Sequence, residues 1–178
     1  MIPELVDIGA KRKVLPLGRY SCSLDDIRER YVPDGDENRS AIWGGLLTVI
    51  NLVRETVGCI AELWIGGSFI TSEENPHDID VVFFFKEDCI KSVDSRGAFV
   101  LNLLSGSYGP DRRVSRYVDS YMIIVPPTEI ENDAKRGYTP LRGYWDQFWS
   151  KTRFEDEDER WLYPAAGYLE VMIDGYDD

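Results

Sequence analysis

The chain has 178 residues and a formal net charge of −12, and 43% of its residues are hydrophobic. This composition is typical of a folded globular protein and excludes a disordered chain. The acidic balance also argues against a broad nucleic-acid-binding surface, which needs clustered positive charge. The length predicts a single domain over residues 1–178, with a core over about residues 38–126 and a C-terminal helix and strand over about residues 139–174.

The cysteines of the chain are few and widely spaced: Cys22, Cys59 and Cys89. His77 is the only histidine, so a structural zinc site, which needs about four grouped ligands, is not predicted. We expect free, reduced cysteines in a cytoplasmic protein. The absence of a signal-peptide pattern and of an apolar run near the roughly 20 residues of a membrane span favours the same location.

Residues 1–22 predict irregular structure, in which the basic cluster at residues 11–13 is a solvated face. Ser23 and Asp26 then have the spacing of a helix-capping box. A short helix should therefore run to about Tyr31.

The longest periodic segment predicts an amphipathic helix over about residues 38–57, because its apolar residues recur at helical spacing. Gly58 is a natural stop for this helix. Gly44 and Gly45 inside it either weaken the helix or allow a neighbouring element to approach closely.

Two central strands are predicted over residues 60–65 and 79–85, and a third over residues 118–125. The second is apolar on both faces, so it should lie inside a sheet that is covered on both sides. The remaining segments are predicted as a helix over residues 86–104, a loop over 105–117, a short helix near Thr128, a helix that begins at Thr139 and Pro140, an acidic turn over 155–159 and a last strand over 168–173. The predicted fold class is thus α/β (α+β), a mixed sheet flanked by helices.

The chemistry of the chain is concentrated where the first central strand passes into the second. Gly66, Gly67 and Ser68 form a turn whose backbone N–H groups and hydroxyl suit phosphate oxygens. Asp78 and Asp80 follow one residue apart at the start of the next strand, so their side chains point to the same side. Paired carboxylates of this kind suit a hard divalent cation.

Asp119 stands at the start of the apolar third strand, where an unpartnered carboxylate is costly. If that strand lies beside the second with the same end at the site, Asp119 joins Asp78 and Asp80. Taken singly, each of these features is more often a turn or a cap. Their order and strand context favour a site.

The spacing of Gly67 and Ser68 to Asp78-Ile79-Asp80, with a later acidic strand residue, resembles the signature of the DNA polymerase beta-like nucleotidyltransferase superfamily. Most of the chain more closely resembles a small, poorly characterised bacterial group within it. The matching segments are Leu15-Pro16-x-Gly18, Trp64 to Phe69, Pro76-x-Asp78-Ile79-Asp80-Val81-Val82, Val118-Asp119-Ser120-Tyr121 and Tyr144-Trp145.

The resemblance implies a Mg²⁺-dependent nucleotidyltransferase with a minimal core. Asp78, Asp80 and Asp119 would hold two Mg²⁺ ions, and Gly66, Gly67 and Ser68 would hold the phosphates of a nucleoside triphosphate, with ATP the expected donor. The acceptor would be a hydroxyl of a protein or RNA, as in toxin–antitoxin or phage-defence systems. Two alternatives stay open: a non-catalytic antitoxin-like binding protein with the same fold, and a transferase that modifies a cationic small molecule attracted by the acidic charge.

Other side chains near these motifs have two interpretations each. Arg112, Arg113 and Arg116 either reach a triphosphate or acceptor or form a solvated loop. His77 is more simply an exposed loop residue than a phosphate ligand. The aromatic group Tyr144, Trp145, Phe148 and Trp149 is expected in the core in preference to a base-stacking surface.

Overall fold

The structure, a computed structural model, describes residues 1–109, 111–127, 133–152 and 164–176. The helices are α1 (Leu24–Tyr31), α2 (Glu37–Thr56), α3 (Glu87–Lys91), α4 (Ser95–Leu104) and α5 (Asp133–Trp149), with a 3₁₀ turn, η1 (Ser68–Ile70). The strands are β1 (Gly18–Ser21), β2 (Glu62–Gly66), β3 (Ile79–Lys86), β4 (Val118–Val125) and β5 (Gly167–Met172).

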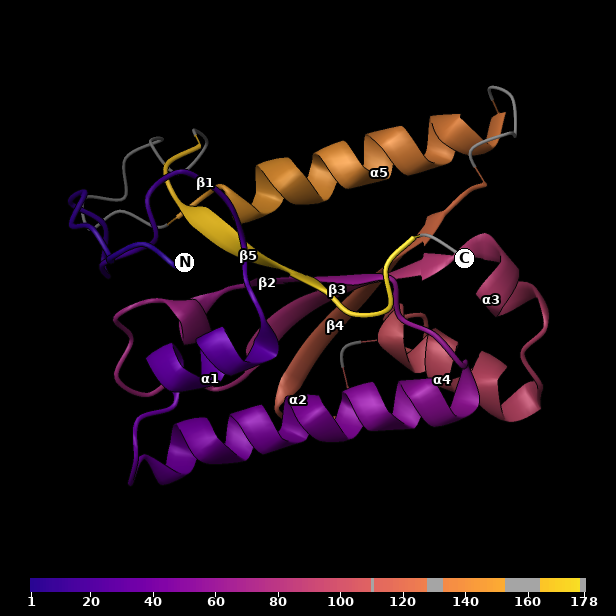
Figure 1. Cartoon of the computed structure of the whole chain (residues 1–178), viewed down its shortest axis with the longest axis horizontal. Coiled ribbons are helices and arrows are strands. Elements are labelled where there is room, and N and C mark those ends of the chain that lie inside the picture. Colours follow the sequence, from indigo (N-terminus) through magenta and orange to yellow (C-terminus); the bar gives the residue numbers. More distant parts are fainter. Residues whose placement is uncertain (110, 128–132, 153–163, 177–178) are drawn as a thin grey trace.

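The described elements form three layers (Figure 1). The sheet is the middle layer, α5 crosses one of its faces, and α1, α2 and α4 cover the other. Both faces of the central strands are therefore shielded from water, as predicted for strands that are apolar on both sides. The α/β fold class predicted from the sequence is confirmed.

Within the described residues, the five strands form one sheet in the order β1-β5-β2-β3-β4. The sheet is mixed, because β1 and β5 are parallel, as are β3 and β4, while β2 is antiparallel to both of its neighbours. The C-terminal strand β5 thus lies between the two strands that come first in the chain. β3 is interior, as expected, and its residues from Val81 to Phe85 are all buried.

Helix α2 supplies much of the core beneath the sheet. Its buried apolar residues are Ile42, Trp43, Leu46, Val49, Ile50 and Val53. Of its two glycines, Gly45 allows close packing, because a β-carbon there would lie 2.8 Å from the β-carbon of Tyr117. The capping box of α1, with Ser23 and Asp26 hydrogen-bonded to each other's backbone, is also present.

Three expected elements differ in the structure. The predicted helix over residues 86–104 is two helices, because Asp94 caps α4 by accepting a hydrogen bond from the backbone N–H of Gly97. Pro140 lies inside α5 and does not begin a helix. The strand β1 forms within a stretch predicted to be irregular. The expectations for Thr128 and for residues 155–159 lie outside the described residues.

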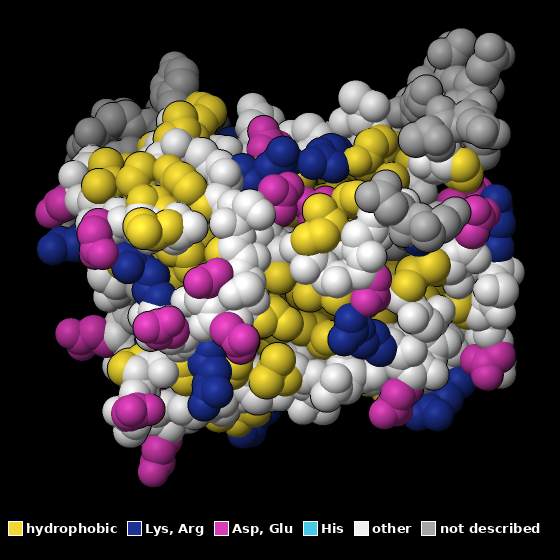
Figure 2. Space-filling view, viewed as in Figure 1, with side chains coloured by type: hydrophobic (Ala, Val, Ile, Leu, Met, Phe, Trp, Pro, Cys, Tyr) yellow, Lys and Arg dark blue, Asp and Glu magenta, His cyan; other side chains and the backbone are white. Residues whose placement is uncertain are grey.

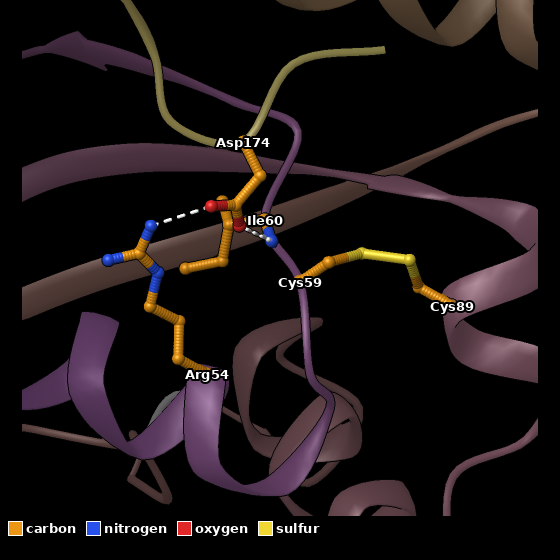
Figure 3. The surroundings of a disulfide bond; sticks show 5 residues. All are labelled: Arg54, Cys59, Ile60, Cys89 and Asp174. Atoms are coloured by element: carbon orange, nitrogen blue, oxygen red, sulfur yellow. Dashed lines mark hydrogen bonds and ion pairs between the residues drawn. A yellow bond between two sulfur atoms is a disulfide. The ribbon is translucent and has the colours of Figure 1, made fainter. Parts of the chain in front are cut away.

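The expectation of free cysteines is wrong for two of the three. Cys59 and Cys89 form a disulfide that links the segment before β2 to α3 (Figure 3), with 6.3 Å between their α-carbons. Beside it, Asp174 accepts hydrogen bonds from Arg54 and from the backbone N–H of Ile60. Cys22 is the free cysteine of the chain.

The surface carries both signs of charge. On the face shown in Figure 2, Lys and Arg side chains alternate with Asp and Glu side chains, so the net charge is not gathered there into one acidic patch. None of the helices in the described segments combines the length and hydropathy needed to cross a membrane.

Candidate functional site

The register of β3 and β4 brings two of the predicted acidic residues together. The strands are parallel, and Asp80 stands directly opposite Asp119 at the end where both strands begin. On its other side Asp80 pairs with Gly66 of β2. Residues opposite each other on neighbouring strands have their side chains on the same face. The third predicted strand therefore lies beside the second with the same end at the site, which is the arrangement that brings Asp119 next to Asp80.

The glycine turn after β2 packs directly against Asp80. Gly67 has φ 72° and ψ −164°, a backbone conformation that is essentially restricted to glycine. A β-carbon at this position would lie 1.6 Å from Oδ2 of Asp80. A β-carbon on Gly66 would lie 2.8 Å from the ring of Trp149. Both glycines are therefore required by close contacts, and Ser68 begins η1 immediately after them.

Arg113, from the loop between α4 and β4, bridges the other two carboxylates. Its Nη1 donates to Oδ2 of Asp78 over 2.7 Å, and its Nη2 lies 3.6 Å from Oδ2 of Asp119. The hydrogen bond to Asp78 raises the pKa of Arg113, so the guanidinium stays charged. The site thus consists of three carboxylates with one resident cation between two of them.

Asp80 is the most perturbed of these acids. Its pKa is raised to about 7, mainly by burial and in the same direction by the negative charges of Asp78 and Asp119, while Arg113 opposes the shift. Tyr121 donates a hydrogen bond of 3.2 Å to Oδ2 of Asp119, and burial followed by the charge of Asp119 raises the pKa of Tyr121 to about 12. Tyr121 therefore acts here as a neutral hydrogen-bond donor. Perturbed acids of this kind gather at functional sites more often than elsewhere.

The donor chemistry fits a hard divalent cation, because three carboxylates surround one corner of the sheet. Their present arrangement does not converge on one point. Among the residues that the structure describes, no group of three or more His, Cys, Asp or Glu side chains is placed to hold a metal ion. The guanidinium of Arg113 lies between two of these acids, where it binds Asp78 and faces Asp119.

A cavity of about 510 Å³ lies beside the glycine turn. Its lining combines the predicted phosphate-binding turn and acid with three basic residues: Gly67, Ser68, Asp80, Lys11, Arg12 and Lys151. The basic cluster at residues 11–13, expected to be only a solvated face, thus contributes two side chains to the wall of this cavity. In a chain of net charge −12, such a gathering of cations suits an anionic ligand.

The loop that follows the glycine turn fixes this basic wall. The backbone N–H of Lys13 donates to Oγ of Ser72 over 2.8 Å, and the backbone N–H of Ser72 donates to the carbonyl of Lys13 over 3.1 Å. Arg12 forms an ion pair with Glu73. The N-terminal segment is therefore held against the loop after the glycine turn. The two segments are far apart in the sequence, so no local sequence pattern predicts this contact.

Arg39 holds the same loop from the other side, and sequence reasoning missed it. Its side chain is buried in α2 and donates to the backbone carbonyls of Tyr31, Phe69 and Glu73. A buried cation with its donors satisfied by carbonyls is a positioning device for the segment that supplies them. The sequence held a signal for it, because Arg39 falls on the apolar face of α2, three residues before Ile42.

The predicted aromatic group divides between two roles. Trp145 and Trp149 are buried against the sheet, where the ring centroids of Trp145 and Tyr121 lie 4.2 Å apart. Tyr144 and Phe148 are about half exposed and stack on each other with ring centroids 5.9 Å apart.

The remaining candidates lie apart from the carboxylates. His77 and Arg112 are exposed, and Arg116 packs over the ring of Tyr117. Of the three arginines, only Arg113 contacts the predicted acidic residues through an ion pair within the described part of the chain.

Comparison with known proteins gives a family and little more. No curated protein matches the chain. No solved structure matches it either. One family model, described as a family of unknown function, DUF6932, matches residues 8–172, which include Asp78, Asp80, Asp119 and the glycine turn. The chain therefore belongs to the DUF6932 family.

Proposed function

We propose that this protein is a nucleotidyltransferase, which moves a nucleoside monophosphate from a nucleoside triphosphate to a hydroxyl acceptor. The observation that carries the proposal is the register of the sheet. It sets Asp80 between Asp119 on one side and the Gly66–Gly67 turn on the other. A cavity with basic walls adjoins the same turn, which suits the polyphosphate of the donor. ATP is the first donor to test.

In the proposed reaction, the acceptor oxygen forms a bond to the α-phosphorus. The bond from that phosphorus to the oxygen that bridges to the β-phosphate breaks, and pyrophosphate leaves with the electron pair. Asp119 receives the proton of the acceptor hydroxyl, since it faces the site with Tyr121 hydrogen-bonded to it. The turn at Gly67 and Ser68, with Lys11, Arg12 and Lys151, holds the leaving phosphates.

Asp78, Asp80 and Asp119 would hold the divalent cation, for which Mg²⁺ is the expected ion. When bound, Mg²⁺ neutralises the phosphate charge and lowers the pKa of the attacking hydroxyl. The carboxylates supply hard oxygen ligands, and the Gly67 turn keeps Asp80 in place beside its neighbours.

The acceptor is proposed to be a hydroxyl of a protein or RNA, as in toxin–antitoxin or phage-defence systems. A cationic small molecule is the alternative acceptor, on the ground of the net charge of −12. A cytoplasmic location is part of the same proposal. The disulfide between Cys59 and Cys89 counts against a cytoplasmic location, because such bonds are rare in reducing compartments.

The test is transfer of label from α-³²P nucleoside triphosphates to protein, RNA or metabolites of a cell lysate in the presence of Mg²⁺. Wild type should give a labelled product, and Asp80→Asn and Asp119→Asn should abolish it. Asp88→Asn is the matched control, because Asp88 is an exposed carboxylate on α3, paired with Lys91 at 3.4 Å. Absence of any labelled product, or label that survives in Asp80→Asn, would contradict the proposal.

One observation favours a second function, that of a non-catalytic binding protein. Arg113 already forms ion pairs with two of the acids, as it would in a site that no longer uses metal. In that case the Asp78→Ala, Asp80→Ala double variant would keep its binding to a co-encoded partner and its biological effect. A double variant that loses the effect and folds normally would exclude this function.

A further inference from the structure

We propose that Arg113 is a resident counter-cation of the acidic site, and that a divalent cation must displace it from Asp78 and Asp119 in order to bind. The inference rests on the proposed function, since it concerns the same carboxylates. It goes beyond it by assigning a role to a basic residue on the loop before β4 and by predicting how metal affinity is set.

The geometry places the guanidinium between side chains of two strands. Nη1 of Arg113 lies 2.7 Å from Oδ2 of Asp78, just before β3, and Nη2 lies 3.6 Å from Oδ2 of Asp119 in β4. A planar guanidinium suits this bridging role, because its donors point in fixed directions toward carboxylate oxygens. The side chain of Arg113 thus occupies the space between Asp78 and Asp119 in which a divalent cation would bind.

The guanidinium of Arg113 and a divalent cation compete for the same negative charge. The three carboxylates repel each other, and one positive charge between Asp78 and Asp119 relieves part of that repulsion. A divalent cation relieves it more fully, and where it takes Oδ2 of Asp78 and Oδ2 of Asp119 as ligands it competes with the guanidinium for those oxygens. As they stand beside Arg113, the acidic side chains of the described residues form no metal-binding group.

The surroundings allow Arg113 to leave. Its side chain is 35% exposed, and it comes from a loop outside the regular elements. Asp78 and Asp119 are less exposed, at 26% and 24%, and each is tied to a strand of the sheet. The guanidinium of Arg113, and not either carboxylate, is therefore the group that moves. A phosphate group entering the site offers the released guanidinium an alternative bidentate partner.

The experiment measures Mn²⁺ binding by the loss of the free-ion signal in electron paramagnetic resonance, on the full chain at fixed ionic strength. Arg113→Gln removes the competing charge and should bind Mn²⁺ about three- to fivefold more tightly than wild type, the factor that corresponds to an exposed ion pair. Arg113→Lys keeps a positive charge and should stay close to wild type.

Arg112→Gln is the matched control, because it removes the same charge from an exposed neighbouring residue. It should leave Mn²⁺ affinity within the error of wild type, so that a general change in net charge is separated from displacement. Asp78→Asn combined with Arg113→Gln should cancel the gain. Circular dichroism checks that each variant is folded.

The outcomes separate the two proposals. If wild type and Arg113→Gln bind Mn²⁺ equally, or if Arg113→Gln binds it more weakly, Arg113 is a structural ion-pair residue and the inference fails while the proposed metal site stands. If Arg112→Gln shows the same gain as Arg113→Gln, displacement is also excluded. If neither wild type nor Arg113→Gln binds Mn²⁺, the inference and the proposed function fall together.

Discussion

Gly67 and Asp80 lie so close together that no side chain fits at position 67. A β-carbon there would be 1.6 Å from Oδ2 of Asp80 and 2.5 Å from its carboxyl carbon. Gly67 directly follows the end of β2, and Asp80 lies at the start of β3. Their contact holds the turn after β2 against the carboxylate of Asp80. The turn and the acid should therefore be disturbed together by any substitution of this glycine.

We expect Gly67→Ala to lower the free energy of unfolding by more than about 3 kcal/mol, since the backbone strain of about 1–3 kcal/mol adds to the clash with Asp80. Urea unfolding measures this. Gly35→Ala is the control, because Gly35 also has a positive φ, 86°, but nothing lies within 4 Å of a β-carbon there. Equal losses in the two variants would show that the contact with Asp80 does not matter.

Arg39 provides a second test, of how the loop after the glycine turn is held. Its guanidinium is buried and donates to carbonyls of Phe69 and Glu73 over 2.7 Å and 2.5 Å. Arg39→Met leaves these acceptors unpaired, and we expect a loss of about 2–4 kcal/mol in the free energy of unfolding. Faster amide hydrogen exchange at residues 69–73 should accompany it.

Arg54→Met is the control for Arg39→Met, because Arg54 lies on the same helix in an exposed ion pair with Asp174. It should cost less than about 1 kcal/mol. If both variants lose the same stability and the exchange at residues 69–73 is unchanged, Arg39 does not position the loop.

Local patterns were enough to predict the elements that carry the carboxylates. The apolar runs of β3 and β4 are bounded by turns, and this pattern predicts both strands. Asp80 and Asp119 are then placed near the start of their strands by their position in the sequence alone. What remained open was whether the strands are neighbours with the same direction. The register of Asp80 with Asp119 answers that, and it depends on the whole chain between them.

The features that sequence reasoning missed are set by long-range contacts. The strand β1 gains its hydrogen bonds from β5, about 150 residues later in the chain, so its four residues carry no pattern of their own. Arg112, Arg113 and Arg116 look alike in the sequence, and only the path of the loop selects Arg113. The cysteine pairing likewise depends on where α3 packs, which neither cysteine's neighbours reveal.

The free cysteine gives a third test. The pKa of Cys22 is raised to about 12, mainly by burial and in the same direction by the charge of Asp26. A thiol with a raised pKa is deprotonated only as the pH approaches that value, so it is unreactive at neutral pH. Alkylation by iodoacetamide at pH 8 should be on the order of a thousandfold slower in the folded protein than in urea, because the thiolate fraction is smaller by about that factor.

The pH profile of this alkylation checks the cause. In the folded protein the rate should rise about tenfold per pH unit between pH 8 and pH 10, whereas in urea it should level off above about pH 9. Cys22→Ser should remove the labelling. A folded-state profile that levels off near pH 9 would mean that the thiol of Cys22 is not perturbed.

The disulfide gives the last test, which also bears on the cellular compartment. The bond between Cys59 and Cys89 closes a stretch in which the two cysteines are 30 residues apart. Loop-closure entropy for that length predicts a contribution of about 3–4 kcal/mol to the free energy of unfolding. Dithiothreitol should lower the stability of wild type by this order and leave the Cys59→Ser, Cys89→Ser double variant unchanged.

Cys22→Ser is the control for the double variant, because it removes the free cysteine and should keep the sensitivity to dithiothreitol. Mass spectrometry after alkylation in urea, without reductant, should show one labelled cysteine in protein taken from an oxidising compartment. Three labelled cysteines in protein taken from cytoplasm would mean that the bond is open there. The segment before β2 and α3 would then be joined by packing alone in the cell, and the measured loss in dithiothreitol would be the stability that the cytoplasmic form lacks.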